Sequence, residues 1–190
     1  MGDKAMIEEI IERFVEKMEK SVANLSGEFS AIRTGRASAA MLDRIMVDYY
    51  GTPTPVTQLA GVKSPEAHLL VVEPWDKQAV QAVSKAIQAS DLGITPSTDG
   101  SVIRLPFPEP TEERRRELVK QCRQRAEEAK VAVRNERRDA NARLERLIKD
   151  EDISKDEVKR AQDQVQKLTD EHTAKIDELL KHKEAEVMEV

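Results

Sequence analysis

Apolar residues recur at alternating three- and four-residue steps in three long stretches of the chain, and this spacing predicts three amphipathic helices. The first covers about residues 4–34, the second 111–150, and the third runs from 154 towards the C-terminus. The stripe of the second helix is interrupted by Glu136 and otherwise contains Leu118, Cys122, Ala126, Ala129, Val133, Ala140, Leu144 and Leu147. Because no such helix can bury its stripe alone, we expect the three to pack as one elongated bundle.

Capping signals mark where these helices begin and end. Thr111 is a suitable N-cap for the second helix, and Ser154 followed by Glu157 has the spacing of a capping box at the start of the third. Gly35 is a stop signal just past the first helix. Arg33 should lie in the last turn of that helix, where the helix dipole favours a cation.

The composition changes between residues 35 and 110, which contain all 8 prolines and 5 of the 7 glycines. Short runs of β-type residues predict strands at 44–50, 68–72 and 102–107, and the continuously apolar 68–72 is typical of a central strand. Residues 51–55 should end the first strand. Residues 76–90 predict one helix with Asp76 as its N-cap. The region therefore predicts a small domain of β/α/β type.

We expect an α+β fold with two domains. Residues 1–34 and 109–190 should form the three-helix bundle, and residues 35–108 a small β/α/β sandwich domain inserted into it. The chain would cross between the domains near 34–36 and near 106–110, and two crossings permit hinging while limiting free tumbling. The predicted hinge residues are Thr34, Gly35, Arg36, Pro106, Pro108 and Pro110.

Charge is distributed unevenly along the chain. The formal net charge is -5, yet residues 111–150 contain 13 Lys or Arg against 9 Asp or Glu. A basic segment in an acidic protein indicates a local anionic partner rather than a general coating of nucleic acid.

The signals for enzyme chemistry are weak. The sequence has no phosphate-binding loop, no dinucleotide fingerprint and no metal-spaced Cys and His set, so we predict no catalytic site, metal or cofactor. The single Cys122 and His172 both lie on apolar stripes, where packing is the simpler interpretation. Tyr49 and Tyr50 fit a sheet and a turn, and Tyr50 is the better candidate for a surface contact. No apolar run is long enough to span a membrane.

A row of cations follows the second helix about 100° from its apolar stripe. The row contains Arg116, Lys120, Arg123, Lys130, Arg134 and Arg137, with Arg138 one turn beyond Arg134. Such a row could follow a phosphate backbone, and Arg is favoured where a bidentate grip matters. The alternative is a solvated face in which Glu113 and Glu127 pair with cations three or four residues away.

Six motifs, in order along nearly the whole chain, closely resemble the ribosome recycling factor family of bacteria and organelles. They are IRTGRAS at 32–38, YYGTPTP at 49–55, ASDLG at 89–93, TEERR at 111–115, VAVRNERRDAN at 131–141 and DQVQKLTD at 163–170. The resemblance implies an L-shaped, tRNA-like outline. It also implies a non-enzymatic factor that binds the large ribosomal subunit after termination and, with elongation factor G and GTP, splits the subunits.

The resemblance also implies roles for particular residues. Arg33 and Arg36, and Arg134 with Arg138, match family positions associated with ribosomal RNA contact and the interdomain elbow. With the basic row, the expected RNA-binding set is Arg33, Arg36, Arg116, Arg123, Lys130, Arg134, Arg137 and Arg138. The expected partners are large-subunit RNA and elongation factor G, with no membrane, and the protein should be a monomer of the cytoplasm or of an organellar stroma or matrix.

Two other functions compete with this hypothesis. A helical-bundle scaffold or chaperone would explain the three helices but neither the Arg-rich row nor the inserted domain. A small hydrolase or transferase would use the α/β region, which offers no convergent set of polar residues.

Overall fold

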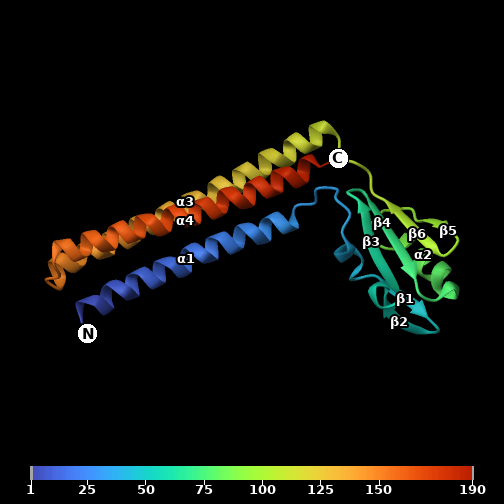
Figure 1. The fold of residues 1–190 in the computed structure, drawn as a ribbon, viewed down its shortest axis with the longest axis horizontal. Coiled ribbons are helices and arrows are strands. Elements are labelled where there is room, and N and C mark those ends of the chain that lie inside the picture. Colours follow the sequence, from blue (N-terminus) through green and yellow to red (C-terminus); the bar gives the residue numbers. More distant parts are fainter. Residues whose placement is uncertain (1, 190) are drawn as a thin grey trace. The chain divides into compact units, whose positions relative to one another are not determined.

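The computed structural model describes residues 2–189. Its long helices are α1 (Asp3–Ala31), α3 (Glu112–Asp150) and α4 (Lys155–Met188), as Figure 1 shows. The chain forms two compact units. The helical unit consists of Met1–Ile32 and Arg116–Ala185, and the mixed unit of Arg33–Arg115 and Glu186–Val190.

The helical unit has a single core to which all three long helices contribute. Phe14 and Met18 from α1, Val133 and Leu144 from α3, and Ile176 from α4 are buried in one cluster. Each such side chain stabilises the fold by roughly 1.5–3 kcal/mol relative to exposure. The predicted bundle and the predicted stripe of the second helix are therefore confirmed.

The polar interruption at Glu136 has a structural explanation. Its Oε2 lies 2.9 Å from Nζ of Lys17, so an ion pair joins α3 to α1 beside the core. His172 is also buried, and its Nδ1 donates a hydrogen bond to the carbonyl of Leu168 at 2.7 Å. Both polar residues serve packing within the bundle.

The sequence signals predicted the starts of the helices more accurately than the end of the first helix. The hydroxyl of Thr111 accepts a hydrogen bond from the Arg114 amide at 3.1 Å, and that of Ser154 accepts one from the Glu157 amide at 3.2 Å. The placement of Arg33 in the last turn of the first helix is wrong. The helix ends at Ala31 because the next residue turns to an extended conformation, with ψ 115.

The mixed unit contains two antiparallel sheets. The four-stranded sheet has the order β3-β4-β6-β5, so β4 is a central strand, as predicted. Its strands are β3 (Ala60–Glu66), β4 (Leu69–Pro74), β5 (Ser97–Asp99) and β6 (Val102–Pro106). The two-stranded sheet consists of β1 (Met46–Tyr49) and β2 (Thr52–Pro55).

One face of the four-stranded sheet is covered by helix α2 (Val80–Gln88). Leu70 and Val72 from β4 and Ile103 from β6 are fully buried with Val83 and Ile87 from α2. The predicted helix at 76–90 is thus present, but its first turn is a 3-10 segment from Lys77 to Ala79. Short 3-10 helices connect the rest of the unit at Ala39–Leu42 and Val56–Gln58.

The first strand ends before residue 51, as predicted, but residues 52–55 form a second strand where only a break was expected. Tyr50 and Gly51 have positive φ values of 49 and 80, and they reverse the chain so that Thr52–Pro55 pairs with β1. Proline is tolerated there because each strand of a two-stranded sheet has a free edge. Strands β3 and β5 were not predicted, because β3 contains Gly61 and Pro65, which signal a turn, and β5 has only three residues.

The α+β class, with three long helices packed as a bundle and a small sheet domain, is confirmed. Among the described residues, no helix is both long and apolar enough to cross a membrane.

Gly35 should be one of the least replaceable glycines. Its φ is +79, and an added Cβ would lie 3.1 Å from Cδ of Pro110. We expect Gly35→Ala to destabilise the mixed unit by about 1–2 kcal/mol from the left-handed backbone alone. The matched control is Gly27→Ala in α1, where a Cβ would meet nothing within 4 Å. This change should stabilise the helix by about 0.5–1 kcal/mol. Guanidinium unfolding of both variants tests the contrast, and equal effects would contradict it.

The hairpin carries a pH-sensitive contact. The Tyr49 hydroxyl donates a hydrogen bond to Oδ2 of Asp76 at 3.0 Å, and this bond raises the pKa of Tyr49 above its ordinary value. Because the raised pKa favours the neutral form in the folded protein, the stabilisation is present below about pH 10 and lost as pH rises through the folded pKa.

We therefore expect Tyr49 to ionise late in an alkaline titration followed by tyrosinate absorbance. The variant Tyr50→Phe isolates the signal, because the chain has 2 tyrosines. Adding Asp76→Asn should lower the Tyr49 pKa while retaining an N-cap, since Asn caps helices as well as Asp does. An unchanged titration after that substitution would exclude Asp76 as the cause.

Candidate nucleic-acid interface

The cations of α3 on the side facing α4 are held by acids and amides of α4. Nε of Arg123 donates to Oε1 of Glu184 at 2.7 Å, and Lys130 forms an ion pair with Asp177. Farther along the helix, Nη1 of Arg137 donates to Oε1 of Gln166 at 3.1 Å. Three of the predicted RNA-binding residues therefore lie along the seam between two helices of the bundle.

The acids of α4 change the electrostatics of this seam. The hydrogen bond and the charge of Glu184 raise the pKa of the Arg123 guanidinium, which remains charged in any case. Arg123 and Lys130 pair with acids of α4, so the alternative in which they pair with Glu127 is not what the structure shows. Glu127 instead holds Arg134, with Oε1 2.6 Å from Nη2.

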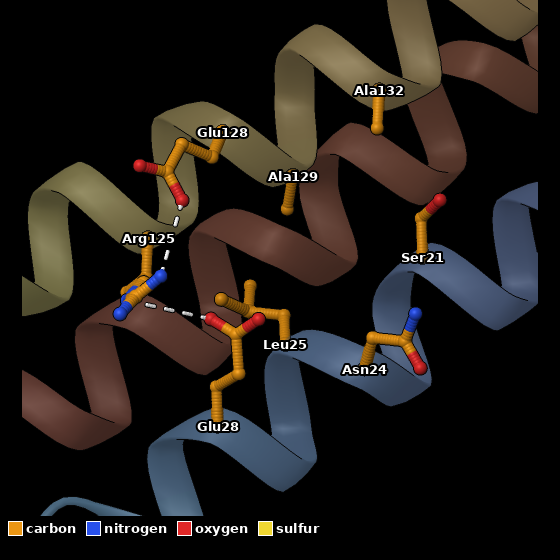
Figure 2. Close-up of a pocket in the computed structure, with 8 residues that line it drawn as sticks. All are labelled: Ser21, Asn24, Leu25, Glu28, Arg125, Glu128, Ala129 and Ala132. Atoms are coloured by element: carbon orange, nitrogen blue, oxygen red, sulfur yellow. Dashed lines mark hydrogen bonds and ion pairs between the residues drawn. The ribbon is translucent and has the colours of Figure 1, made fainter.

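The side of α3 that faces α1 also carries internally paired charges. Nε of Arg125 lies 3.6 Å from Oε2 of Glu28, and its Nη1 lies 3.4 Å from Oε2 of Glu128. Figure 2 shows these three side chains beside a groove between α1 and α3. The groove has a volume of about 170 Å³ and is otherwise lined by Ser21, Asn24, Leu25, Ala129 and Ala132. Because the groove is small and its charged side chains are already paired, it is a poor binding site for a ligand.

The outward face of α3 has a different character. Arg138 is exposed, and its side chain has no hydrogen bond or ion pair with any residue of the described chain. Val131, two turns earlier on the same face, is 43% exposed. This face can therefore offer a cation to an anionic partner without first breaking an internal ion pair.

Two of the other predicted cations, Arg33 and Arg36, precede the first strand. Arg33 is exposed and has no hydrogen bond or ion pair within residues 2–189, whereas Nη1 of Arg36 lies 2.7 Å from Oε2 of Glu189. The Thr34 hydroxyl donates to Oε1 of Glu186 at 3.3 Å. Arg36 and Thr34 are thus tied to the last residues of the chain, within the mixed unit.

The predicted hinge residues contact one another inside the mixed unit. A Cβ on Gly35 would lie 3.1 Å from Pro110 Cδ and 3.6 Å from the Pro108 carbonyl oxygen. Nδ1 of His68 donates to the Gly35 carbonyl at 2.9 Å, and the His68 carbonyl accepts from the Phe107 amide at 2.7 Å. His68, which sequence reasoning missed, therefore contacts both connecting segments.

Asp177 and Glu184 were also missed, although the sequence carries a signal for them. With Asp170, they place acids at seven-residue intervals along α4. In packed helices such a repeat puts charges beside the apolar seam, where they meet the neighbouring helix. No group of three or more His, Cys, Asp or Glu that could hold a metal ion occurs within the described part of the chain.

Comparison with known proteins identifies the family. The family model described as ribosome recycling factor matches residues 25–188. The chain belongs to the ribosome recycling factor family. It is 56% identical over 185 residues to the ribosome-recycling factor of Geobacillus kaustophilus (strain HTA426), covering 97% of this chain and 100% of that protein. The relative from Carboxydothermus hydrogenoformans (strain ATCC BAA-161 / DSM 6008 / Z-2901) is 55% identical over the same shares.

Solved structures of the ribosome recycling factor family have the same fold. A solution structure of the ribosome recycling factor is 43% identical, with a TM-score of 0.68 over 96% of this chain and 97% of that one. The expected family and its bacterial type are confirmed. Membership of the ribosome recycling factor family makes this chain a translation factor rather than an enzyme.

The ion pairs between α3 and α4 can be tested by removing their acids. In Asp177→Asn with Glu184→Gln, Lys130 and Arg123 lose their acidic partners, so the protein should elute from heparin at higher salt. Each pair is partly exposed to solvent and should contribute about 1 kcal/mol or less to stability, so the bundle should stay folded. The control is Glu171→Gln with Glu178→Gln, which removes the same charge from α4 but frees neither cation. Equal elution of both variants would show that net charge alone decides the interaction.

Proposed function

We propose that this protein binds the large subunit of the post-termination ribosome and, with elongation factor G and GTP, separates the two subunits for a new round of translation. The observation that carries this proposal is the similarity along the whole chain, at 56% identity over 97% of its length. Similarity of this extent includes both units and the segments that connect them. A scaffold or chaperone would need only the bundle.

A solved structure supports the choice of partners. It presents models for the T. thermophilus ribosome recycling factor and the E. coli elongation factor G bound to the E. coli post-termination complex. Its matching chain is 43% identical to this one, with a TM-score of 0.61 over 96% of this chain. We extend to this chain the same two partners, the post-termination ribosome and elongation factor G.

We assign the contact with ribosomal RNA to the eight predicted cations, which differ in whether acids of this chain already pair with them. Arg33 and Arg138 are exposed and unpaired among the described residues, so they can bind phosphate directly. The seam cations Arg123 and Lys130 would have to share or exchange their α4 acids. Free cations release counterions from RNA at no internal cost, so Arg138 should dominate the affinity contributed by α3. The full set is Arg33, Arg36, Arg116, Arg123, Lys130, Arg134, Arg137 and Arg138.

We propose that the protein acts by transmitting force along its helical bundle. Helix α3 has 39 residues, which at 1.5 Å per residue is about 58 Å, and its core contacts with α1 and α4 resist bending. A force delivered by elongation factor G could therefore be transmitted along the bundle. GTP would be hydrolysed by that factor, since the sequence of this chain has no phosphate-binding loop.

We also propose hinging near residues 34–36 and 106–110, through Thr34, Gly35, Arg36, Pro106, Pro108 and Pro110. Pro108 and Pro110 lie beyond β6 and donate no amide hydrogen bond, so this part of the segment can change its path without losing backbone pairing, whereas Pro106 pairs with Leu69 at the end of β6. The domain boundaries that go with this hinge are 1–34 with 109–190, and 35–108. We further propose that the protein acts as a monomer and that it does so in a bacterial cytoplasm, for which the bacterial origin of its relatives is the support.

The function is tested with purified post-termination ribosomes, elongation factor G and GTP. Subunit separation should require this protein, the factor and GTP together. Omission of any one component should abolish it. Separation at full rate without this protein would refute the proposed function.

Arg138→Ala tests the RNA contact. It should leave stability unchanged, because the side chain has no partner among the described residues. Large-subunit affinity should fall, and the slope of log affinity against log salt should decrease by about one. Arg160→Ala on α4 is the control, since Arg160 is an exposed Arg outside the proposed set. Unchanged affinity and slope in Arg138→Ala would place the contact elsewhere on the bundle.

A further inference from the structure

The helical unit has a groove between α1 and α4, which we call the α1–α4 groove. Two cavities lie in it, with volumes of about 610 and 440 Å³, compared with about 170 Å³ for the cavity between α1 and α3 in Figure 2. The first is lined from residues 4–12 and 157–164, and the second from residues 19–26 and 172–182. Because α1 and α4 run in the same direction (Figure 1), the two cavities follow one another along the helix pair.

The floor of the α1–α4 groove is apolar along its length. Between the two cavities, Val15 of α1 and Leu168 of α4 each lie one helical turn from lining residues on both sides. The apolar residues along the groove that pack against the core but are only partly covered are Ile7, Val15, Val22, Leu168 and Leu179. Residues 4–26 of α1 span about 33 Å at 1.5 Å per residue, which is the length of a long helix.

His172 adds an unsatisfied acceptor to this groove. The residue is 3% exposed and belongs to the lining of the second cavity. Because its Nδ1 donates to the Leu168 carbonyl, its Nε2 is left as an acceptor, and this atom has no hydrogen-bond partner within residues 2–189. A buried acceptor without a donor destabilises a fold, so packing alone does not account for a histidine here. A donor from a bound partner would satisfy it.

Acids outnumber bases around the α1–α4 groove. The bases of the lining are Lys4, Arg160 and Lys175. The acids of the lining are Glu8, Glu12, Glu19, Glu157 and Glu178. Glu12 and Glu19 are exposed, and their carboxylates have no hydrogen bond or ion pair with any described residue. These two carboxylates can therefore pair with a partner without first breaking an internal contact.

The charge of the whole helices distinguishes a protein partner from a nucleic acid. Together α1 and α4 carry 16 Asp or Glu and 11 Lys or Arg, whereas α3 carries 9 and 13. The excess of acids on α1 and α4 repels phosphates and favours a partner with Lys or Arg. A long groove with an apolar floor and charged edges suits an amphipathic helix, whose apolar face lies in the groove.

We propose that the α1–α4 groove is the docking site for a basic amphipathic helix of a protein. Its apolar side chains would cover the groove floor, and its Lys or Arg would pair with Glu12 and Glu19. Proteins that hold RNA neutralise its phosphates with Lys and Arg. Under the function proposed above, on which this inference rests, the partner is therefore a Lys- and Arg-rich segment of a protein of the large ribosomal subunit.

Cross-linking identifies what lies in the groove. Ala23→Cys places a thiol at an exposed position of the lining, and Ala142→Cys places one on α3, four residues from Arg138. Cys122 is fully buried, so a benzophenone maleimide should label only the introduced cysteine. On purified large subunits, the label at position 23 should cross-link to a basic segment of a ribosomal protein. The label at position 142 should cross-link to ribosomal RNA.

Neutralising the free acids gives a second test. Glu12→Gln with Glu19→Gln should lower the affinity for purified large subunits about fivefold, as the loss of two exposed ion pairs does. The melting temperature should stay unchanged, because neither carboxylate has a partner among the described residues.

The matched control is Glu9→Gln with Glu16→Gln. It removes the same charge from exposed positions of α1 with the same spacing, and neither residue lines the α1–α4 groove. Removal of an acid lessens the repulsion of RNA, so the control should bind large subunits as tightly as the unsubstituted protein or more tightly. Weaker binding by the groove variant alone could therefore not arise from net charge.

The remaining outcomes are distinguishable. A label at position 23 that reaches RNA, an acidic protein segment or a second copy of this chain would overturn the docking site. No cross-link from position 23, while position 142 reaches RNA, would overturn it and leave the proposed function intact. Equal affinities of the two double variants would also overturn it. Failure of the unsubstituted protein to bind large subunits at all would instead refute the proposed function.

Discussion

Burial of three apolar stripes in one core is the interaction on which the helical unit depends. None of the long helices has a partner within its own segment, and α1 can be covered only when the chain returns after residue 111. At the edge of the core, the polar residues Lys17 and Glu136 satisfy each other as an ion pair. The same packing determines which sides of α3 contact α1 and α4 and which side remains exposed to solvent.

The division of α3 into buried and exposed sides determines which of its cations can reach a partner. From the sequence alone, nothing distinguishes the cations of α3 that are available to a partner from those that are not. In the folded bundle Arg123 and Lys130 are neutralised by acids of α4, and Arg125 by acids on α1 and α3, while Arg138 remains open. A helix that both holds a bundle together and contacts an anion can thus separate the two tasks by face. The same division leaves a positively charged face on a chain whose net charge is -5.

In the mixed unit, Asp76 has a comparable double role. One carboxylate oxygen caps the 3-10 turn that leads into α2, and the other accepts the hydroxyl of Tyr49 and lies near that of Tyr50. The start of a core helix and the orientation of an exposed aromatic residue are therefore coupled through one side chain. A strained turn residue can be maintained in this way because the sheet and helix beside it are already stable.

The sequence by itself determined the three helices, the capped starts of the second and third, the central strand at 68–72 and the family, because these depend on periodicity, local hydrogen bonding and motif order. It misjudged residues 52–55 as a break, since proline signals a turn unless a free strand edge is available. Only the tertiary structure decided which acids pair with Arg123 and Lys130, and which cations remain open. The reason is physical: neighbours three or four residues apart are set by helix geometry, whereas contacts such as Arg123 with Glu184 depend on the register between segments far apart in the chain.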